Sequence, residues 1–83
     1  MNESHQKLDH LKKVAYFREY RDLAEKGNFS EALGLNQKSY EFLYEMCIKE
    51  KDAKFKAKIQ KALEIIANDG QFIQNQLNIQ EES

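Results

Sequence analysis

The feature that most constrains the fold is an apolar stripe of helical period in the last third of the chain. Its residues recur at steps of three and four over about six turns, the spacing of one face of an α-helix: Phe55, Ile59, Ala62, Leu63, Ile66, Gly70, Ile73 and Leu77. Ile65 and Phe72 lie beside this stripe and widen the apolar face enough to touch two neighbouring helices, or one helix and a ligand. The pattern predicts a helix over residues 52–78, with Asp52 as its N-cap.

One segment inside this helix can be interpreted in two ways. Asn68, Asp69 and Gly70 could end one helix and let a fourth begin at Gln71. The stripe keeps its phase across these residues, so we expect one continuous helix.

Two further helices are predicted before it, over residues 4–26 and 30–50. The first carries apolar residues at the same spacing: Leu8, Leu11, Val14, Ala15, Phe17, Tyr20, Leu23 and Ala24. Gly27 after the basic Lys26 is a typical helix stop, and Asn28 with Glu31 resembles the capping box of the next helix. The interior Gly34 indicates either a close approach of another helix or a tolerated surface position.

The composition agrees with helices rather than strands. Proline and threonine are absent, valine occurs once, and only three glycines interrupt the 83 residues. Short connections at Gly27 and near Lys51 force antiparallel neighbours. We therefore predict an all-α fold, an antiparallel three-helix bundle forming a single helical domain over residues 1–83.

Catalytic and metal-binding signatures are missing. His5 and His10 are five residues apart and do not share a helix face, and Cys47 has no local partner that marks it as a nucleophile. The single cysteine excludes an internal disulfide and favours a reducing compartment. The first residues are polar, and no apolar run approaches the roughly 20 residues that span a bilayer. We expect a cytoplasmic protein that is no enzyme, has no cofactor and binds no metal.

Six lysines lie within residues 49–61, although the formal net charge of the chain is only −1. Such a cluster can bind an acidic peptide, a lipid headgroup or a phosphate backbone. It can equally be a solvated helix face, since Glu50, Asp52 and Glu64 dilute its charge. No arginine or aromatic platform accompanies it, so nucleic acid is not the expected partner.

The most specific string runs from Lys26 to Leu33, where a Gly-Asn-Phe turn leads into Glu-Ala-Leu. This string resembles the hairpin of tetratricopeptide repeats, with Ala32 permitting close helix contact and Phe29 filling the turn. A hairpin of this type followed by one long helix is similar to the microtubule-interacting and transport (MIT) domain. The resemblance covers about residues 8–78, including Leu35, the run 40–43 and the stripe of the third helix.

The resemblance implies a peptide-binding adaptor in membrane trafficking. Such domains are usually attached to a larger protein, so we expect this chain to be the N-terminal domain of a longer one. MIT domains take short C-terminal motifs of ESCRT-III proteins into grooves between their helices, which implies association with endosomes through partners. The groove between the second and third helices would be lined by Tyr44, Met46, Ile48, Ala62, Ile66, Ala67 and Asp69. The alternative groove, between the first and third helices, would be lined by Tyr16, Tyr20, Ile65 and Phe72.

The chain departs from the family pattern at several positions. Asn36 stands where the family often has tyrosine, and Gly70 where it has alanine. Ala67 is small where a larger leucine is common, and Asn68 and Gln71 are neutral where acidic residues meet a basic residue of the peptide. The usual motif would then bind weakly, or the other groove would be used.

A different function class is a small helical chaperone or interaction subunit that dimerises or pairs with a partner helix. It would follow from Ile65 and Phe72 being left exposed on a lone chain. We expect a monomer, with a dimer possible, whereas this alternative predicts a dimer or an obligate heterodimer.

Overall fold

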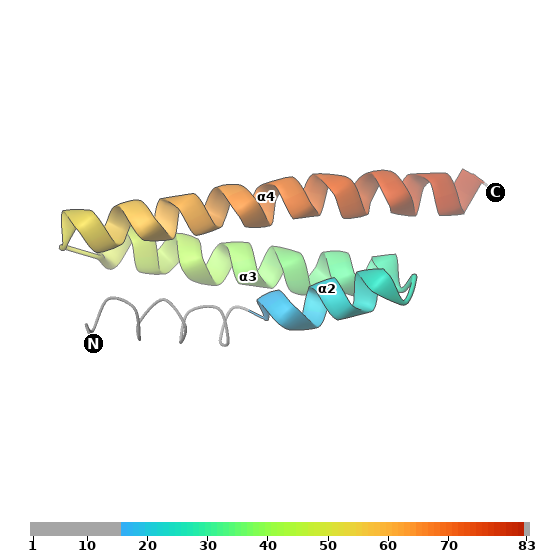
Figure 1. Ribbon diagram of the computed structural model, residues 1–83, viewed down its shortest axis with the longest axis horizontal. Helices are drawn as coiled ribbons and strands as arrows, with labels where there is room; N and C mark the ends of the chain where they lie inside the picture. Colours follow the sequence, from blue (N-terminus) through green and yellow to red (C-terminus); the bar gives the residue numbers. More distant parts are fainter. Residues whose placement is uncertain (1–15, 83) are drawn as a thin grey trace.

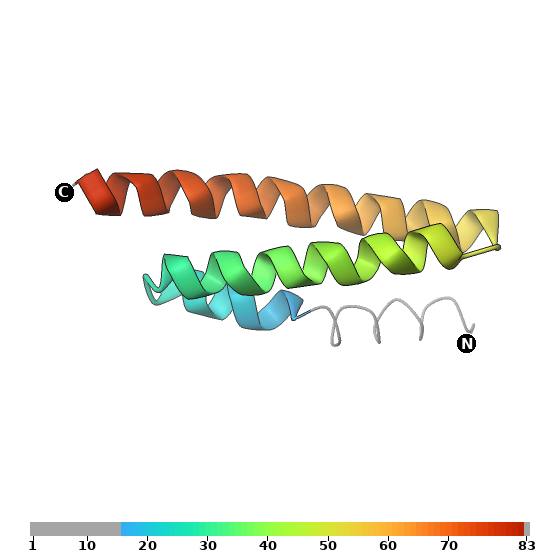
Figure 2. The same ribbon diagram turned by 180° about the vertical axis from the view of Figure 1, so that it is seen from behind.

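The computed structural model describes residues 16–82 as three α-helices joined by two short connections (Figure 1). They are α2 (Phe17–Glu25), α3 (Phe29–Lys49) and α4 (Ala53–Glu82). The antiparallel helices α3 and α4 lie side by side along the whole of α3, and α2 packs beside the first half of α3, as Figures 1 and 2 both show. Residues 16–82 contain no strand, and the predicted all-α three-helix architecture is confirmed.

The turn between α2 and α3 is built by Gly27. Its φ of 86° lies in the left-handed region that glycine adopts without strain. The Gly27 amide donates to the Ala24 carbonyl at 3.0 Å, and the Asn28 amide donates to the Leu23 carbonyl at 2.9 Å. These two bonds form a Schellman motif, which satisfies the last carbonyls of α2. The predicted helix stop at Gly27 is confirmed.

The two later helices begin differently. The Asn28 side chain makes no capping hydrogen bond, so the expected capping box with Glu31 is not formed. At α4 the Asp52 carboxylate accepts from the Lys54 amide at 3.0 Å, which confirms the predicted N-cap.

The predicted helix over residues 4–26 is matched only in part. Tyr16 has a φ of 60°, a left-handed conformation that cannot continue a right-handed helix, and α2 accordingly begins at Phe17. The apolar residues predicted earlier in this helix, and both histidines, lie outside the described residues: His5, Leu8, His10, Leu11, Val14 and Ala15.

Helix α4 is continuous through Gly70, as its unbroken apolar phase predicts, and it runs past the predicted end at Asn78 to Glu82. Gly34 is an exposed position, since a Cβ placed there would meet nothing within 4 Å. The close approach occurs at Gly70 instead, where a Cβ would lie 2.5 Å from Oδ1 of Asn36.

Within residues 16–82 the core consists of two apolar clusters. The larger joins α3 and α4 and contains Leu43, Cys47, Phe55, Ile59, Leu63 and Ile66. The smaller joins all three helices through Tyr20, Ala32 and Ile73. Along α3, two buried polar residues lie between Ala32 of the smaller cluster and Leu43 of the larger one. They are Asn36 and Ser39. No helix within residues 16–82 is long and apolar enough to cross a bilayer.

Candidate functional site

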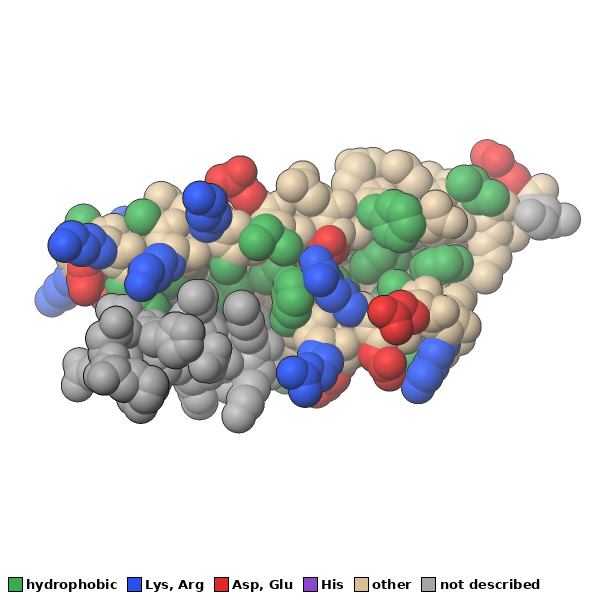
Figure 3. Space-filling model, viewed as in Figure 1, with side chains coloured by type: hydrophobic (Ala, Val, Ile, Leu, Met, Phe, Trp, Pro, Cys, Tyr) green, Lys and Arg blue, Asp and Glu red, His purple; other side chains and the backbone are tan. Residues whose placement is uncertain are grey.

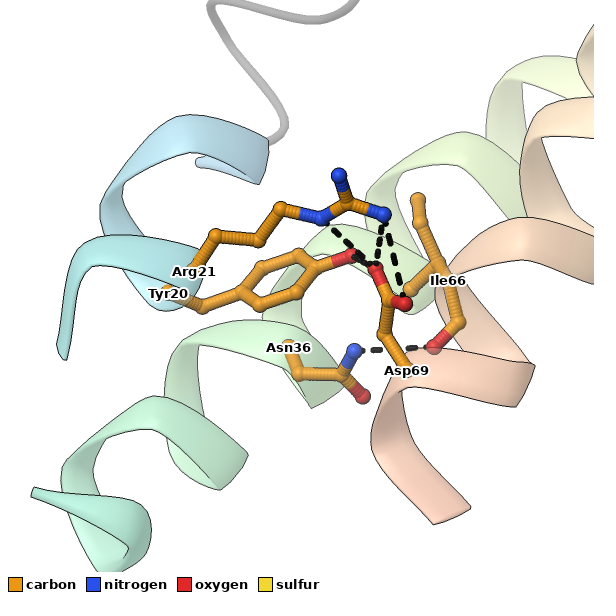
Figure 4. Close-up of polar contacts among 5 residues, drawn as sticks. All are labelled: Tyr20, Arg21, Asn36, Ile66 and Asp69. Atoms are coloured by element: carbon orange, nitrogen blue, oxygen red, sulfur yellow. Dashed lines mark hydrogen bonds and ion pairs between the residues drawn. The ribbon is translucent and has the colours of Figure 1, made fainter. Parts of the chain in front are cut away.

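A polar network ties α2 to α4 (Figure 4). The Tyr20 hydroxyl donates to Oδ2 of Asp69 at 2.6 Å, and Nε of Arg21 donates to the same oxygen at 3.0 Å. An Nη2 hydrogen bond to Oδ1 at 3.3 Å makes the Arg21 contact bidentate. A charge-assisted bidentate pair fixes orientation as well as distance, so the network sets how α2 lies on α4.

The Tyr20 side chain is completely buried. Burial raises the pKa of Tyr20 above its ordinary value of 10.0, and the hydrogen bond and charge of Asp69 raise that pKa further. The phenol therefore stays protonated at neutral pH and remains the donor of the short bond to Asp69.

Aromatic contacts on α2 support the same arginine. The Phe17 ring meets the Tyr20 ring edge to face, with centroids 5.5 Å apart. The guanidinium carbon of Arg21 lies 4.3 Å from the Phe17 centroid, within the range of a cation–π interaction. Arg21 is thus held by a ring on one side and a carboxylate on the other.

Asn36 connects α3 to α4 beneath this network. Its buried side-chain amide donates to the Ile66 carbonyl at 2.8 Å, and its oxygen occupies the space that Gly70 leaves empty. Asn36 and Gly70 are therefore neighbours across the contact between α3 and α4. The structure places them in contact, so a small residue on α4 accommodates the polar one on α3.

An open pocket of about 400 Å³ lies beside the network, between α2, the first residue of α3 and the second half of α4. Figure 3 shows hydrophobic side chains gathered between α2 and α4. The pocket is lined by Tyr20, Arg21, Ala24, Glu25, Phe29, Asp69, Phe72, Ile73 and Gln76. Ile73 is buried, whereas 59% of the Phe72 surface is exposed. The arrangement offers an apolar cavity with charged groups at its edge.

The structure brings together part of the predicted alternative groove. Tyr20 and Phe72 both line the pocket, Tyr20 with its hydroxyl already bound to Asp69. Tyr16 and Ile65 are exposed, and neither lines the pocket.

The residues predicted for the groove between the second and third helices do not form one surface. Tyr44, Ile48 and Ala67 are exposed, whereas Met46 and Ala62 are half-buried against the larger core cluster. Ile66 is 1% exposed and belongs to that core, so its side chain cannot meet a peptide in this arrangement. Asp69 points to α2 rather than to α3, and it belongs with the pocket.

Sequence reasoning missed several members of the site. Arg21, Ala24, Glu25 and Gln76 line the pocket but carry no motif. A further pair that sequence reasoning missed lies outside the pocket. Tyr40 stacks on Tyr44 with ring centroids 6.3 Å apart. Their spacing of four residues in a helix is the pattern that predicts such a contact.

Among residues 16–82 no group of three or more His, Cys, Asp or Glu side chains is placed to hold a metal ion. Comparison of the chain with models of protein families, with curated proteins and with solved structures finds no match in any of the three.

Proposed function

We propose that the chain is a protein–protein interaction module that binds a short linear peptide between α2 and α4. The observation that carries this proposal is the pocket of about 400 Å³ with Phe72 exposed at its rim and Ile73 buried at its base. A pocket of this size lies within the range of ligand sites, and it accepts one or two apolar side chains. Covering Phe72 removes apolar surface from water, at about 25 cal/mol per Å².

The resemblance to the MIT domain supports the same proposal from the sequence side. It names the C-terminal tails of ESCRT-III proteins as the first ligands to test, and a cytoplasmic, partner-dependent association with endosomes as the setting. That family often has tyrosine at the position of Asn36 and alanine at the position of Gly70, and here these two residues contact each other. The open pocket favours the groove between α2 and α4 over the groove between α3 and α4.

The test is an NMR titration of the isotope-labelled chain with a panel of ESCRT-III C-terminal peptides. Amide shifts at Ala24, Phe29 and residues 69–76 are expected on binding. Phe72→Ser should weaken binding at least tenfold, because an exposed aromatic side chain that a ligand covers on binding is a typical hot spot. Tyr44→Ser, an equally exposed aromatic on α3, is the matched control and should bind normally.

The two variants also separate the two grooves. A loss of binding in Tyr44→Ser with normal binding in Phe72→Ser would move the site to the groove between α3 and α4. No shift with any peptide, from a folded monomer, would reject ESCRT-III tails as ligands.

A second candidate function is pairing with a partner helix or a second copy. Ile65 and Phe72 are seven residues apart on α4 and both are exposed, which places two apolar side chains on one side of the helix. Sedimentation equilibrium tests this candidate. A dimer that becomes a monomer in Phe72→Ser supports it, and a monomeric wild-type chain that binds peptide argues against it.

A further inference from the structure

The end of the bundle where α3 connects to α4 carries unneutralised positive charge. Residues 49–61 hold six lysines and two acidic residues. Among residues 16–82 the ion pairs formed are Arg21 with Asp69 and Lys26 with Asp22, so none of these six lysines is paired. Figure 3 shows basic side chains gathered over the beginning of α4.

The two acidic residues of this segment are occupied by the backbone. A Glu50 carboxylate oxygen accepts from the Asp52 amide at 3.1 Å, and an Asp52 oxygen accepts from the amides of Lys54 and Phe55 at 3.0 and 3.5 Å. Both carboxylates therefore serve the connection and the N-terminus of α4. These carboxylates still lower the local charge, as the sequence suggested, but six lysines against two carboxylates leave a net charge of +4 in residues 49–61.

The lysines surround this end of the bundle. Lys54, Lys58 and Lys61 share one side of α4, because they are four and seven residues apart. Lys56 lies on another side, two residues from Lys54 and Lys58. Lys49 ends α3 and Lys51 lies in the connection. A charge distribution of this kind fits a broad anionic surface better than a single bound strand.

An exposed aliphatic side chain accompanies the charge. Ile48, immediately before Lys49, is 62% exposed, and Tyr44 one turn earlier is 52% exposed. An aliphatic residue with a tyrosine and lysines suits the bilayer interface, where the apolar groups enter the headgroup boundary and the ammonium groups stay at the phosphates.

We infer that this end of the bundle, which we call the basic end (residues 48–61), docks the protein on an anionic phospholipid surface. Docking combines two favourable contributions. The unpaired lysines are attracted to the anionic headgroups, and the Ile48 side chain is buried at the lipid interface. The pocket lies between α2 and the second half of α4, so a docked molecule keeps it open to a peptide. This inference does not depend on the proposed peptide binding.

An acidic peptide is the less favoured occupant. It would contact lysines along one line and leave the others unpaired, and it gives no reason for the exposure of Ile48. The experiment therefore includes polyglutamate as a competing anion.

The first measurement is co-sedimentation of the whole chain with phosphatidylcholine vesicles, with or without phosphatidylserine at about a third of the lipid. Binding is expected only with phosphatidylserine, and it should weaken as salt shortens the range of the charges. Lys51→Gln/Lys54→Gln should lower the partition coefficient about 25-fold, which is about fivefold for each lysine. The control is Arg18→Gln/Lys38→Gln, which removes two exposed cations outside the basic end. This variant should change the partition coefficient much less.

The second measurement reports insertion. The chain has no tryptophan, so Ile48→Trp introduces a single fluorophore at the basic end. Its emission should shift to shorter wavelength with phosphatidylserine vesicles, whereas Phe72→Trp at the pocket should not shift. Circular dichroism confirms that each variant is folded.

Equal binding to both kinds of vesicle, or equal losses in the two double variants, would overturn the inference. It would also be overturned if polyglutamate bound with the same lysine dependence while the Ile48→Trp emission stayed unchanged on vesicles. That result would identify an acidic chain as the partner.

Discussion

At the scale of single residues, Asn36 and Gly70 depend on each other. Glycine within a helix costs about 1 kcal/mol against alanine, so Gly70 weakens α4 locally. It is needed because the Asn36 side chain is buried and donates to the Ile66 carbonyl. The polar contact between α3 and α4 therefore requires a position without a side chain.

Gly70→Ala should lower the free energy of unfolding by about 1–2 kcal/mol. The added Cβ would lie 2.5 Å from Oδ1 of Asn36, and overpacking outweighs the gain in helix propensity. In an Asn36→Ala background the same change should be neutral or stabilising. Urea denaturation of the four proteins gives the coupling energy, and equal effects in the two backgrounds would contradict this account.

Because of Tyr20, the folding stability should depend on pH in the alkaline range. Burial raises its pKa in the folded state above the ordinary 10.0, so the stabilisation is complete below pH 10 and is lost as pH rises further. Above that pH the unfolded chain releases the proton while the folded chain retains it. The free energy of unfolding should then fall by up to about 1.4 kcal/mol per pH unit from this group.

Tyr20→Phe removes this contribution, and Tyr44→Phe, at an exposed tyrosine, serves as the control. Chemical denaturation between pH 9 and 11 should give a flatter dependence for Tyr20→Phe alone. The lysines are common to all three proteins and therefore cancel in this comparison. Parallel curves for the two variants would show that Tyr20 titrates normally.

At the scale of the helices, α4 carries lysines at an unfavourable end, where the N-cap Asp52 only partly offsets them. Its first turn has no acidic residue, and Lys54 and Lys56 lie beside the positive end of the helix dipole. Such a placement lowers stability, and the docking that we propose for the basic end would account for it.

Lys54→Gln should therefore raise the free energy of unfolding by about 0.3–0.5 kcal/mol at low ionic strength. The gain should largely disappear in 1 M salt, where the Debye length is about 3 Å. Lys38→Gln, in the middle of α3, is the control and should leave stability nearly unchanged. A stability gain that is independent of salt would point to helix propensity rather than charge.

At the scale of the whole molecule, the two apolar clusters share α3 and α4, with Asn36 and Ser39 between them on α3. Within residues 16–82 Ser39 is the one buried side chain whose oxygen lacks a hydrogen-bond partner. We call Asn36 and Ser39 the polar level. Because it separates the two apolar clusters along α3, whether the clusters unfold together has to be measured. Chains of this size normally unfold in one cooperative step.

Ile73→Val in the smaller cluster should lower the free energy of unfolding by about 0.5–1.5 kcal/mol. If unfolding is cooperative, hydrogen exchange should accelerate equally for the most protected amides around Ile73 and around Ile59. Acceleration confined to the neighbours of Ile73 would show that the polar level divides the molecule into two units.

Patterns within the sequence specify the helices and most of their ends. The apolar period of α4, the stop at Gly27 and the cap at Asp52 act between residues a few positions apart, so they can be read along the chain. Tyr20 and Phe72, two of the four residues predicted for the groove between the first and third helices, line one pocket. Only helix packing shows that another helix approaches closely at Gly70 and not at Gly34.

Asp69 illustrates the limit. Helical period gives the side of α4 on which Asp69 lies but not which neighbouring helix covers that side. Its partner Arg21 is 48 residues away, and only packing brings the two together. The pocket depends on the same packing, because its walls come from three helices. Local signals thus specify the elements, whereas the site follows from contacts that no local signal encodes.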